Sequence, residues 1–141
     1  MKLFDKHIER GVQVIRINGM FPIFLVESFK TDMILRDFII THGWGNGYVG
    51  IPSWHPYYKM DYNEIPIECH GGLTYGNIDE DEDLWVIGFD TCHLDDNKTK
   101  CSKKFVKENC LHIIEQCMEV KEAQRILKLN KLHDGRTTRS V

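Results

Sequence analysis

Leu84-Trp85-Val86-Ile87-Gly88-Phe89 is the stretch of this 141-residue sequence that decides the fold. Such an almost continuously apolar run is typical of an interior strand that is buried on both faces of a sheet. The residues that follow it, Asp90-Thr91-Cys92-His93, are mostly polar. Because functional sites often form where a buried strand gives way to a loop, Asp90 and His93 become candidate functional residues.

Further strand-like runs precede this stretch. Residues 12–17 and 23–26 flank a glycine-containing turn and predict two paired strands. Residues 38–42 and 48–51 flank a glycine-dense segment with Asn46-Gly47, which is a strong hairpin signal, so a second hairpin is expected there. Residues 65–69 alternate between apolar and polar side chains and predict one more strand.

The C-terminal part of the chain is helical in pattern. Ser102 suits a helix N-cap, and an apolar stripe follows at Val106, Cys110, Ile113, Ile114 and Cys117. The pattern continues through residues 122–127, so one helix of more than 20 residues is expected if it is unbroken. Residues 29–36 also have helical spacing, over a short segment.

These elements predict an α+β fold, with a mainly antiparallel sheet and a long C-terminal helix packed on one face. The length predicts a single domain over residues 1–132, followed by a flexible polar tail over residues 133–141. The five consecutive acids at residues 79–83 lack the spacing of an EF-hand loop and are expected to form a solvated loop.

Composition excludes several classes of partner. A net charge of −3 is too small for general nucleic-acid binding. No apolar run is long enough for a membrane helix, and the N-terminus lacks a signal-peptide pattern, so a cytoplasmic protein is expected. The five cysteines include no CxxC pair, which favours reduced thiols.

Two histidines carry the strongest chemical signal. His70 and His93 each follow an apolar run, and one can act as general base and the other as general acid in cleaving a phosphodiester. In this interpretation Asp90 orients one ring, while Thr74 and the backbone amides of Gly71 and Gly72 hold a phosphate oxygen. The alternative is that both histidines are ordinary strand-end residues whose nitrogens pair with the backbone.

Other chemistry at the same residues is less well supported. His70, Asp90 and His93, with His55 completing the set, have the side chains of a zinc or iron site. The spacing is less persuasive than the residue types, so we expect no metal or other cofactor. Cysteine catalysis is disfavoured because Cys69 and its neighbour His70 would point to opposite faces of a strand, as would Cys92 and His93.

Aromatic residues supply the expected ligand contacts. Tyr48, Trp54, His55 and Tyr57 lie in or near loops, where flat rings suit stacking on a nucleobase. Anchoring of a loop on the core is the alternative role for these rings.

The sequence resembles a family of small proteins from phages and phage-derived bacterial regions. The resemblance rests on residues 47–52, His55-Pro56, His70-Gly71-Gly72-Leu73-Thr74 and Gly88-Phe89-Asp90 with His93. In the family pattern valine commonly stands at position 69 and cysteine at position 91, which counts against a required role for the cysteines here. The resemblance implies a phage setting more firmly than it implies an activity.

In general character, small phage proteins of this kind are similar to counter-defence proteins that bind or cleave nucleotide alarm signals. We therefore expect a protein in the cytoplasm of the infected bacterial host that binds a small nucleotide-type ligand and cleaves a phosphodiester bond in it. A non-catalytic sponge for the same ligand is the alternative, and a structural or protein-inhibiting phage factor is a third. An exposed sheet edge would also allow a homodimer or a higher homo-oligomer.

Overall fold

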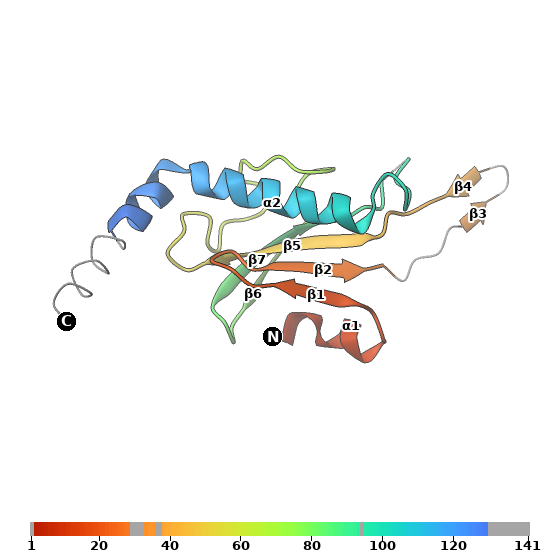
Figure 1. Ribbon diagram of the computed structural model, residues 1–141, viewed down its shortest axis with the longest axis horizontal. Helices are drawn as coiled ribbons and strands as arrows, with labels where there is room; N and C mark the ends of the chain where they lie inside the picture. The colour runs from red at the N-terminus through yellow and green to blue at the C-terminus, as the bar shows by residue number, and fades with distance from the viewer. Residues whose placement is uncertain (1, 29–32, 36–37, 94, 130–141) are drawn as a thin grey trace.

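The computed structural model describes residues 2–28, 33–35, 38–93 and 95–129, and it has the predicted α+β architecture (Figure 1). A sheet of five antiparallel strands has the order β1-β2-β5-β7-β6. The strands are β1 (Val14–Ile17), β2 (Ile23–Glu27), β5 (Gly45–Pro52), β7 (Leu84–Phe89) and β6 (Tyr75–Asp79). The short strands β3 (Met33–Leu35) and β4 (Phe38–Ile40) form a separate hairpin.

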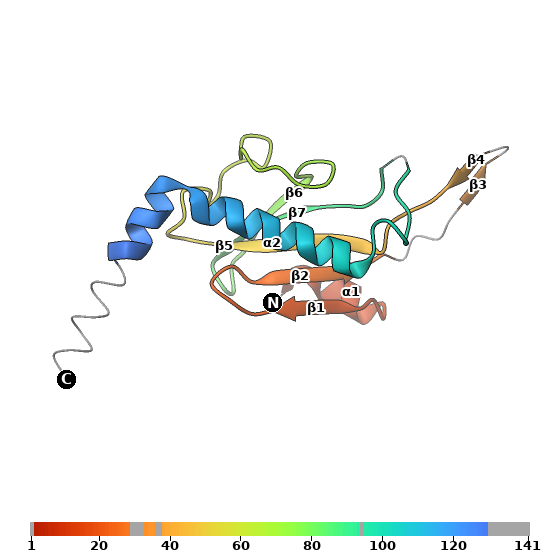
Figure 2. The ribbon, with the colours of Figure 1, turned by 45° about the horizontal axis from the view of Figure 1, so that its top comes forward.

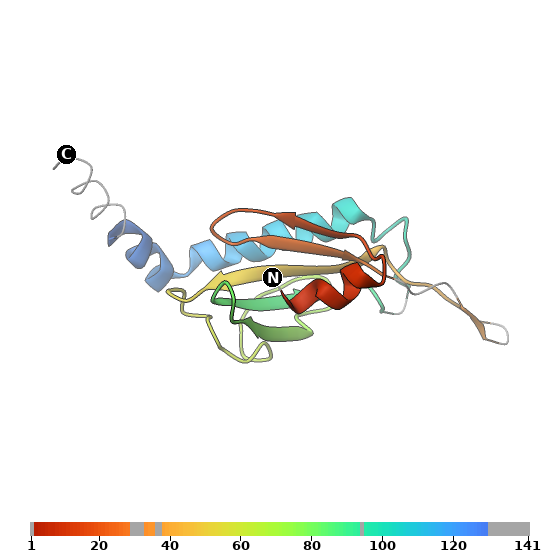
Figure 3. The same cartoon turned by 90° about the horizontal axis from the view of Figure 1, so that it is seen from below.

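Each face of the sheet has its own apolar core. In β2, Ile23 and Leu25 point to the face that the long helix α2 (Lys103–Glu119) covers, while Phe24 and Val26 point to the other face. The N-terminal 3-10 turn η1 (Lys2–Phe4) and helix α1 (Asp5–Glu9) cover that second face, as the view from below shows (Figure 3). Because successive side chains of a strand point to opposite faces, the apolar residues of β2 pack into both cores.

Helix α2 confirms the predicted stripe and cap. Ser102 accepts a hydrogen bond from the backbone N–H of Phe105, and the buried residues are Val106, Cys110, Ile113 and Cys117. The expected helical continuation is present but is separated from α2 by a break, because Val120 is extended and ends α2, and residues 121–129 form a further helical segment. None of the described helices is long and apolar enough to cross a membrane. The expected tail at residues 133–141 lies outside the described residues.

The predicted hairpin around Asn46-Gly47 is wrong. Both residues lie inside β5, the middle strand, which runs without interruption from Gly45 to Pro52. A Cβ atom on Gly47 would lie 2.6 Å from the Cys110 sulfur of α2 and 2.7 Å from the Phe89 ring. Gly47 is therefore required for close packing of the helix on the sheet and not for a turn.

Two other expected elements also differ. Residues 33–35, expected to be helical, form strand β3, and residues 29–32 and 36 lie outside the described residues. Residues 65–69 form no strand, although Ile65 and Ile67 are buried, because the Ile67 N–H donates back to the Ile65 C=O at 2.8 Å in a tight turn. The segment lies against α2, where the Gln116 side-chain amide accepts from the N–H of Glu68 (2.8 Å) and donates to its C=O (2.7 Å). A glutamine side chain thus replaces the partner strand.

Within the acidic run 79–83, residues 80–83 form the exposed turn between β6 and β7, as expected of a solvated loop. The expectation is wrong for Asp79, which is buried at the end of β6. The turn is tied to the sheet by a bidentate ion pair in which the Arg16 guanidinium contacts both Glu82 carboxylate oxygens at 2.6 Å. Strand β6 itself has no clear apolar pattern in the sequence, and it forms because β7 offers it a complete antiparallel partner.

Candidate functional site

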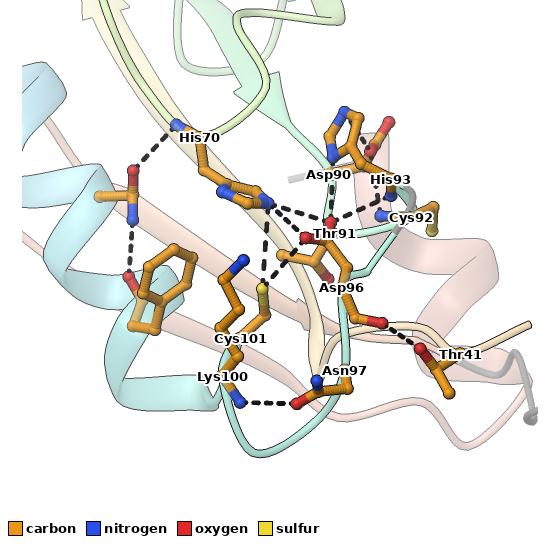
Figure 4. Close-up of polar contacts among 12 residues, drawn as sticks. Thr41, His70, Asp90, Thr91, Cys92, His93, Asp96, Asn97, Lys100 and Cys101 are labelled. Atoms are coloured by element: carbon orange, nitrogen blue, oxygen red, sulfur yellow. Dashed lines mark hydrogen bonds and ion pairs between the residues drawn. The ribbon is translucent and has the colours of Figure 1, made fainter.

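The candidate site is organised by Asp96, a residue in the loop that follows β7 (Figure 4). His70 Nε2 lies 2.9 Å from both carboxylate oxygens of Asp96. His93 contributes its backbone N–H and its ring Nδ1, each 3.0 Å from Asp96 Oδ2. The two histidine rings meet edge to face with centroids 5.3 Å apart. One buried carboxylate therefore joins both sequence-predicted histidines.

His93 faces a carboxylate with each of its ring nitrogens. Nδ1 contacts Asp96, and Nε2 lies 3.4 Å from Asp90 Oδ1 in an ion-pair contact. A neutral imidazole carries a single N–H, so a neutral His93 would direct a lone pair at one of the two carboxylates. The arrangement is satisfied by a doubly protonated ring or by a cation bound at one of the nitrogens.

The electrostatics of Asp96 favour its charged form. Its side chain is only 2% exposed, and burial by itself raises the pKa of a carboxyl group. Hydrogen bonds from His70 and His93 outweigh this effect and lower the pKa of Asp96 to about 2. The site therefore holds a negative charge throughout the physiological pH range.

Helix α2 and the segment before it position His70. The backbone N–H of His70 donates to Asn109 Oδ1 at 3.0 Å, and the His70 ring packs edge to face against Phe105. Cys101 Sγ lies 3.5 Å from Asp96 Oδ1 and 3.9 Å from His70 Nε2. Burial and the nearby negative charge of Asp96 raise the pKa of Cys101, which favours the thiol over the thiolate.

The loop that carries His93 and Asp96 is held at the end of the sheet by the chain entering β5. The backbone N–H of Gly43 donates to Thr91 at 2.7 Å, and that of Trp44 donates to Cys101 at 2.8 Å. The Thr41 hydroxyl donates to the backbone C=O of Asp96. These contacts fix both ends of the loop from residue 91 to residue 101.

Gly71 makes room for His93. Its backbone has a φ of +68°, and a Cβ atom at this position would lie 2.3 Å from His93 Cε1. Gly72 also has a positive φ, of +80°, but a Cβ atom there would meet nothing within 4 Å. Both glycines are required for the turn, and Gly71 is also required for contact between the turn and the histidine ring.

Two further residues that the sequence predicts for the site, Thr74 and Tyr48, differ in their burial. Thr74 is exposed just before β6, with its backbone N–H bonded to Gly88. Tyr48 is buried in the core on the α1 face, where its ring packs against Phe4 and Tyr75.

His55 lies apart from His70 and His93. Its Nε2 contacts the backbone C=O of Cys117 at 2.9 Å, and its Nδ1 accepts from the N–H of Tyr57. Burial lowers the pKa of His55, so this ring is a neutral structural residue. Trp54 and Tyr57 pack against it and anchor their loop on the core. The structure therefore does not bring His55, Trp54 or Tyr57 to the Asp96 site.

Asp96 is not among the residues that the sequence pattern singled out. One signal was present, because Asp90, His93 and Asp96 follow one another at intervals of three residues. Such spacing brings side chains together only if the chain turns tightly after the strand, as the hydrogen bond from Asp96 N–H to the His93 C=O shows it does. Cys101, Phe105 and Asn109 carry no comparable signal, because their positions depend on where α2 crosses the sheet.

Comparison with protein-family models, curated proteins and solved structures finds no significant match to this chain. The candidate site therefore rests on its own geometry.

Proposed function

We propose that the protein binds a small nucleotide-type ligand and cleaves a phosphodiester bond in it, with His70 and His93 as the acid-base pair. The observation that supports this proposal is the joining of both rings through Asp96, at 2.9 Å to His70 and 3.0 Å to His93. A carboxylate that fixes the orientation of an imidazole is a recurring feature of acid-base catalysis.

The hydrogen bonds assign a role to each ring. Donation from His70 Nε2 to Asp96 leaves His70 Nδ1 as the nitrogen with a lone pair, so His70 is the general base. His93 lies between two carboxylates, and Asp90 is the partner nearer to solvent. We assign His93 the complementary role of general acid, acting through Nε2.

In the proposed reaction, His70 takes a proton from water as the water oxygen attacks phosphorus. The bond from phosphorus to the leaving oxygen breaks, and His93 gives that oxygen its proton. The products are a phosphomonoester and an alcohol. Gly71 lies against His93 in a turn with positive φ, where a backbone amide is suited to bind a phosphate oxygen. The Gly72 amide instead donates to the Cys69 C=O at 3.0 Å.

The resemblance to small phage proteins suggests the biological setting. We propose that the ligand is a nucleotide alarm signal of an infected bacterium and that cleavage counteracts host defence. A sponge would use the same hydrogen bonds without turnover, so the test must distinguish cleavage from binding.

The test uses bis(4-nitrophenyl) phosphate and a panel of cyclic mono- and dinucleotides as probes, in buffer containing EDTA. We expect turnover by the unmodified chain and a loss of about 100- to 10,000-fold in His70→Ala and in His93→Ala, the range for loss of one acid or base. His112→Ala is the matched control, because His112 is an exposed histidine of α2 that pairs with Glu115.

Chromatography of each nucleotide after incubation and heat release separates the alternatives. Intact nucleotide, retained before heating and recovered unchanged, would identify a sponge. Full turnover in both histidine variants would contradict the acid-base assignment.

A further inference from the structure

We propose that His70, His93 and Asp96 form a binding site for one divalent transition-metal ion of the zinc class. The inference goes beyond the proposed function, because metal binding at these residues does not depend on a nucleotide or on turnover. Three observations support the metal site: the distances among the ligand atoms, the contacts of His93 with two carboxylates, and the charge of Asp96.

The ligand atoms are already gathered. One nitrogen from each histidine and one oxygen of Asp96 all lie within 4.8 Å of one another. Asp96 Oδ2 is 2.9 Å from His70 Nε2 and 3.0 Å from His93 Nδ1. In a tetrahedral site with bonds of about 2.0–2.1 Å, neighbouring ligand atoms are about 3.3 Å apart, close to both Asp96–histidine distances. The two histidine nitrogens, which lie within 4.8 Å of each other, would have to move closer together.

The two carboxylates on His93 match the surroundings of a metal-bound histidine. When one ring nitrogen binds a metal, the other carries the proton, and in metal sites that N–H almost always donates to a carboxylate, a carbonyl or water. At His93 the metal would bind Nδ1, on the Asp96 side, and Nε2–H would donate to Asp90, which lies 3.4 Å away. This occupancy satisfies both nitrogens with a neutral ring.

Charge also favours a cation at this place. Asp96 is buried, and within the described part of the chain its ion-pair contacts are with the two histidines and with no lysine or arginine. Two imidazoles and one carboxylate suit zinc and the neighbouring metals better than magnesium or calcium, which prefer oxygen ligands. With three protein ligands, a further position remains for water.

Metal binding would change the chemistry of the site. A metal on His70 Nε2 places the ring proton on Nδ1, so His70 no longer acts as a base. The activated water of the site is then the natural nucleophile. Zinc would thus inhibit a purely acid-base enzyme, and metal chelators would inhibit a metal-dependent one.

The experiment is calorimetric titration of the full chain with ZnCl₂ after removal of metals by EDTA and dialysis, with Co²⁺ absorption spectra as a second readout. We expect one zinc ion per chain, and a Co²⁺ spectrum of low-symmetry coordination. His70→Ala, His93→Ala and Asp96→Asn are expected to weaken binding by at least about 100-fold. Asp90→Asn is expected to weaken it by about 10- to 100-fold, the usual range for the partner of a ligand.

Asp95→Asn is the matched control, because Asp95 is the exposed neighbour of the buried Asp96. Circular dichroism of each variant checks the fold, and the two histidine variants carry the test if Asp96→Asn does not fold. The proposal is overturned if the unmodified chain binds no zinc in stoichiometric amount, or if both histidine variants bind it as tightly as the unmodified chain.

The two proposals fail separately. Zinc binding with no cleavage of any probe would remove the proposed function and keep the metal site. Cleavage in EDTA by a chain that binds no zinc would keep the function and remove the metal site.

Discussion

At the scale of single residues, Asp96 and Gly71 do more for the candidate site than their types suggest. Asp96 joins two histidines that are distant in the sequence. Gly71 lets the chain turn beside His93 without a clash. Both act on the geometry of groups that carry the chemistry.

Gly71 and Gly72 form a natural pair for testing this. Each needs a positive φ, so alanine at either position costs about 1 kcal/mol of backbone strain. Only at Gly71 would the added Cβ meet the His93 ring, at 2.3 Å. We expect Gly71→Ala and Gly72→Ala to lower the melting temperature by similar small amounts, while Gly71→Ala alone reduces zinc affinity and turnover, by about tenfold or more.

Melting curves, zinc titration and probe hydrolysis on both variants check this prediction. Equal effects of the two substitutions on zinc affinity and turnover would show that contact between Gly71 and the His93 ring does not position the site.

At the scale of secondary structure, the site is assembled where α2 contacts the segment of residues 68–70. Asn109 and Gln116 project from the same helix and hold the backbone of residues 68–70, through His70 N–H and both polar groups of Glu68. The helix thus both covers the core and fixes the direction in which His70 enters the site.

These two amides predict separable effects. Gln116→Ala removes two hydrogen bonds to Glu68 and one to the His112 C=O, at a partly exposed position. It is expected to lower the free energy of unfolding by about 1–2 kcal/mol with little effect on turnover. Asn109→Ala removes the hydrogen bond to the backbone of His70 and one to the Phe105 C=O. It is expected to cost about 1 kcal/mol of stability but to reduce turnover about tenfold.

Urea denaturation and probe hydrolysis on the two variants decide the matter. If turnover falls as much in Gln116→Ala as in Asn109→Ala, the helix stabilises the segment as a whole and Asn109 has no particular role in placing His70.

The elements that could be predicted from sequence are those whose pattern has one cause. The helical stripe from Val106 to Cys117 and the apolar run of β7 are set by burial alone, and both are present in the structure. Gly47 has a second cause, since it makes room for Cys110, and the turn signal there was misleading. The segment 65–69 has the burial pattern of a strand but pairs with a side chain of α2.

Some residues of the candidate site could be predicted from the sequence, and others could not. His70, Asp90 and His93 come together as expected, because the turn that follows residues 65–69 and the loop that follows β7 lie against each other. Asp96 is harder to predict, because its three-residue spacing from His93 has meaning only if the chain turns tightly, and consecutive polar residues do not show which one is buried. The expected aromatic ligand contacts of Trp54, His55 and Tyr57 are core contacts around the far end of α2.

At the scale of the whole molecule, Asp96 links segments that are distant in sequence. Its carboxylate contacts His70 and His93, and its backbone C=O accepts from Thr41. The start of α2, the loop that follows β7 and the chain entering β5 lie at the same end of the sheet (Figure 2). Asp96 connects them through its contacts with His70, His93 and Thr41. Ionisation of this residue should be coupled to the stability of the entire fold.

The sign of the coupling follows from the pKa of Asp96. Folding lowers this pKa from an ordinary value of 3.8 to about 2, so the unfolded chain takes up the proton first as the pH falls. The resulting stabilisation, about 2 kcal/mol, is fully present above about pH 4 and is lost as the pH falls from about 4 to about 2. In EDTA, the free energy of unfolding of the unmodified chain should therefore fall by about 2 kcal/mol more across this window than that of Asp96→Asn.

Urea denaturation at several pH values measures both curves, with Asp95→Asn expected to follow the unmodified chain because Asp95 is exposed. Parallel curves for the unmodified chain and Asp96→Asn would mean that the two histidines do not stabilise the Asp96 carboxylate in the folded protein, and the hydrogen-bonded cluster would lose its energetic basis.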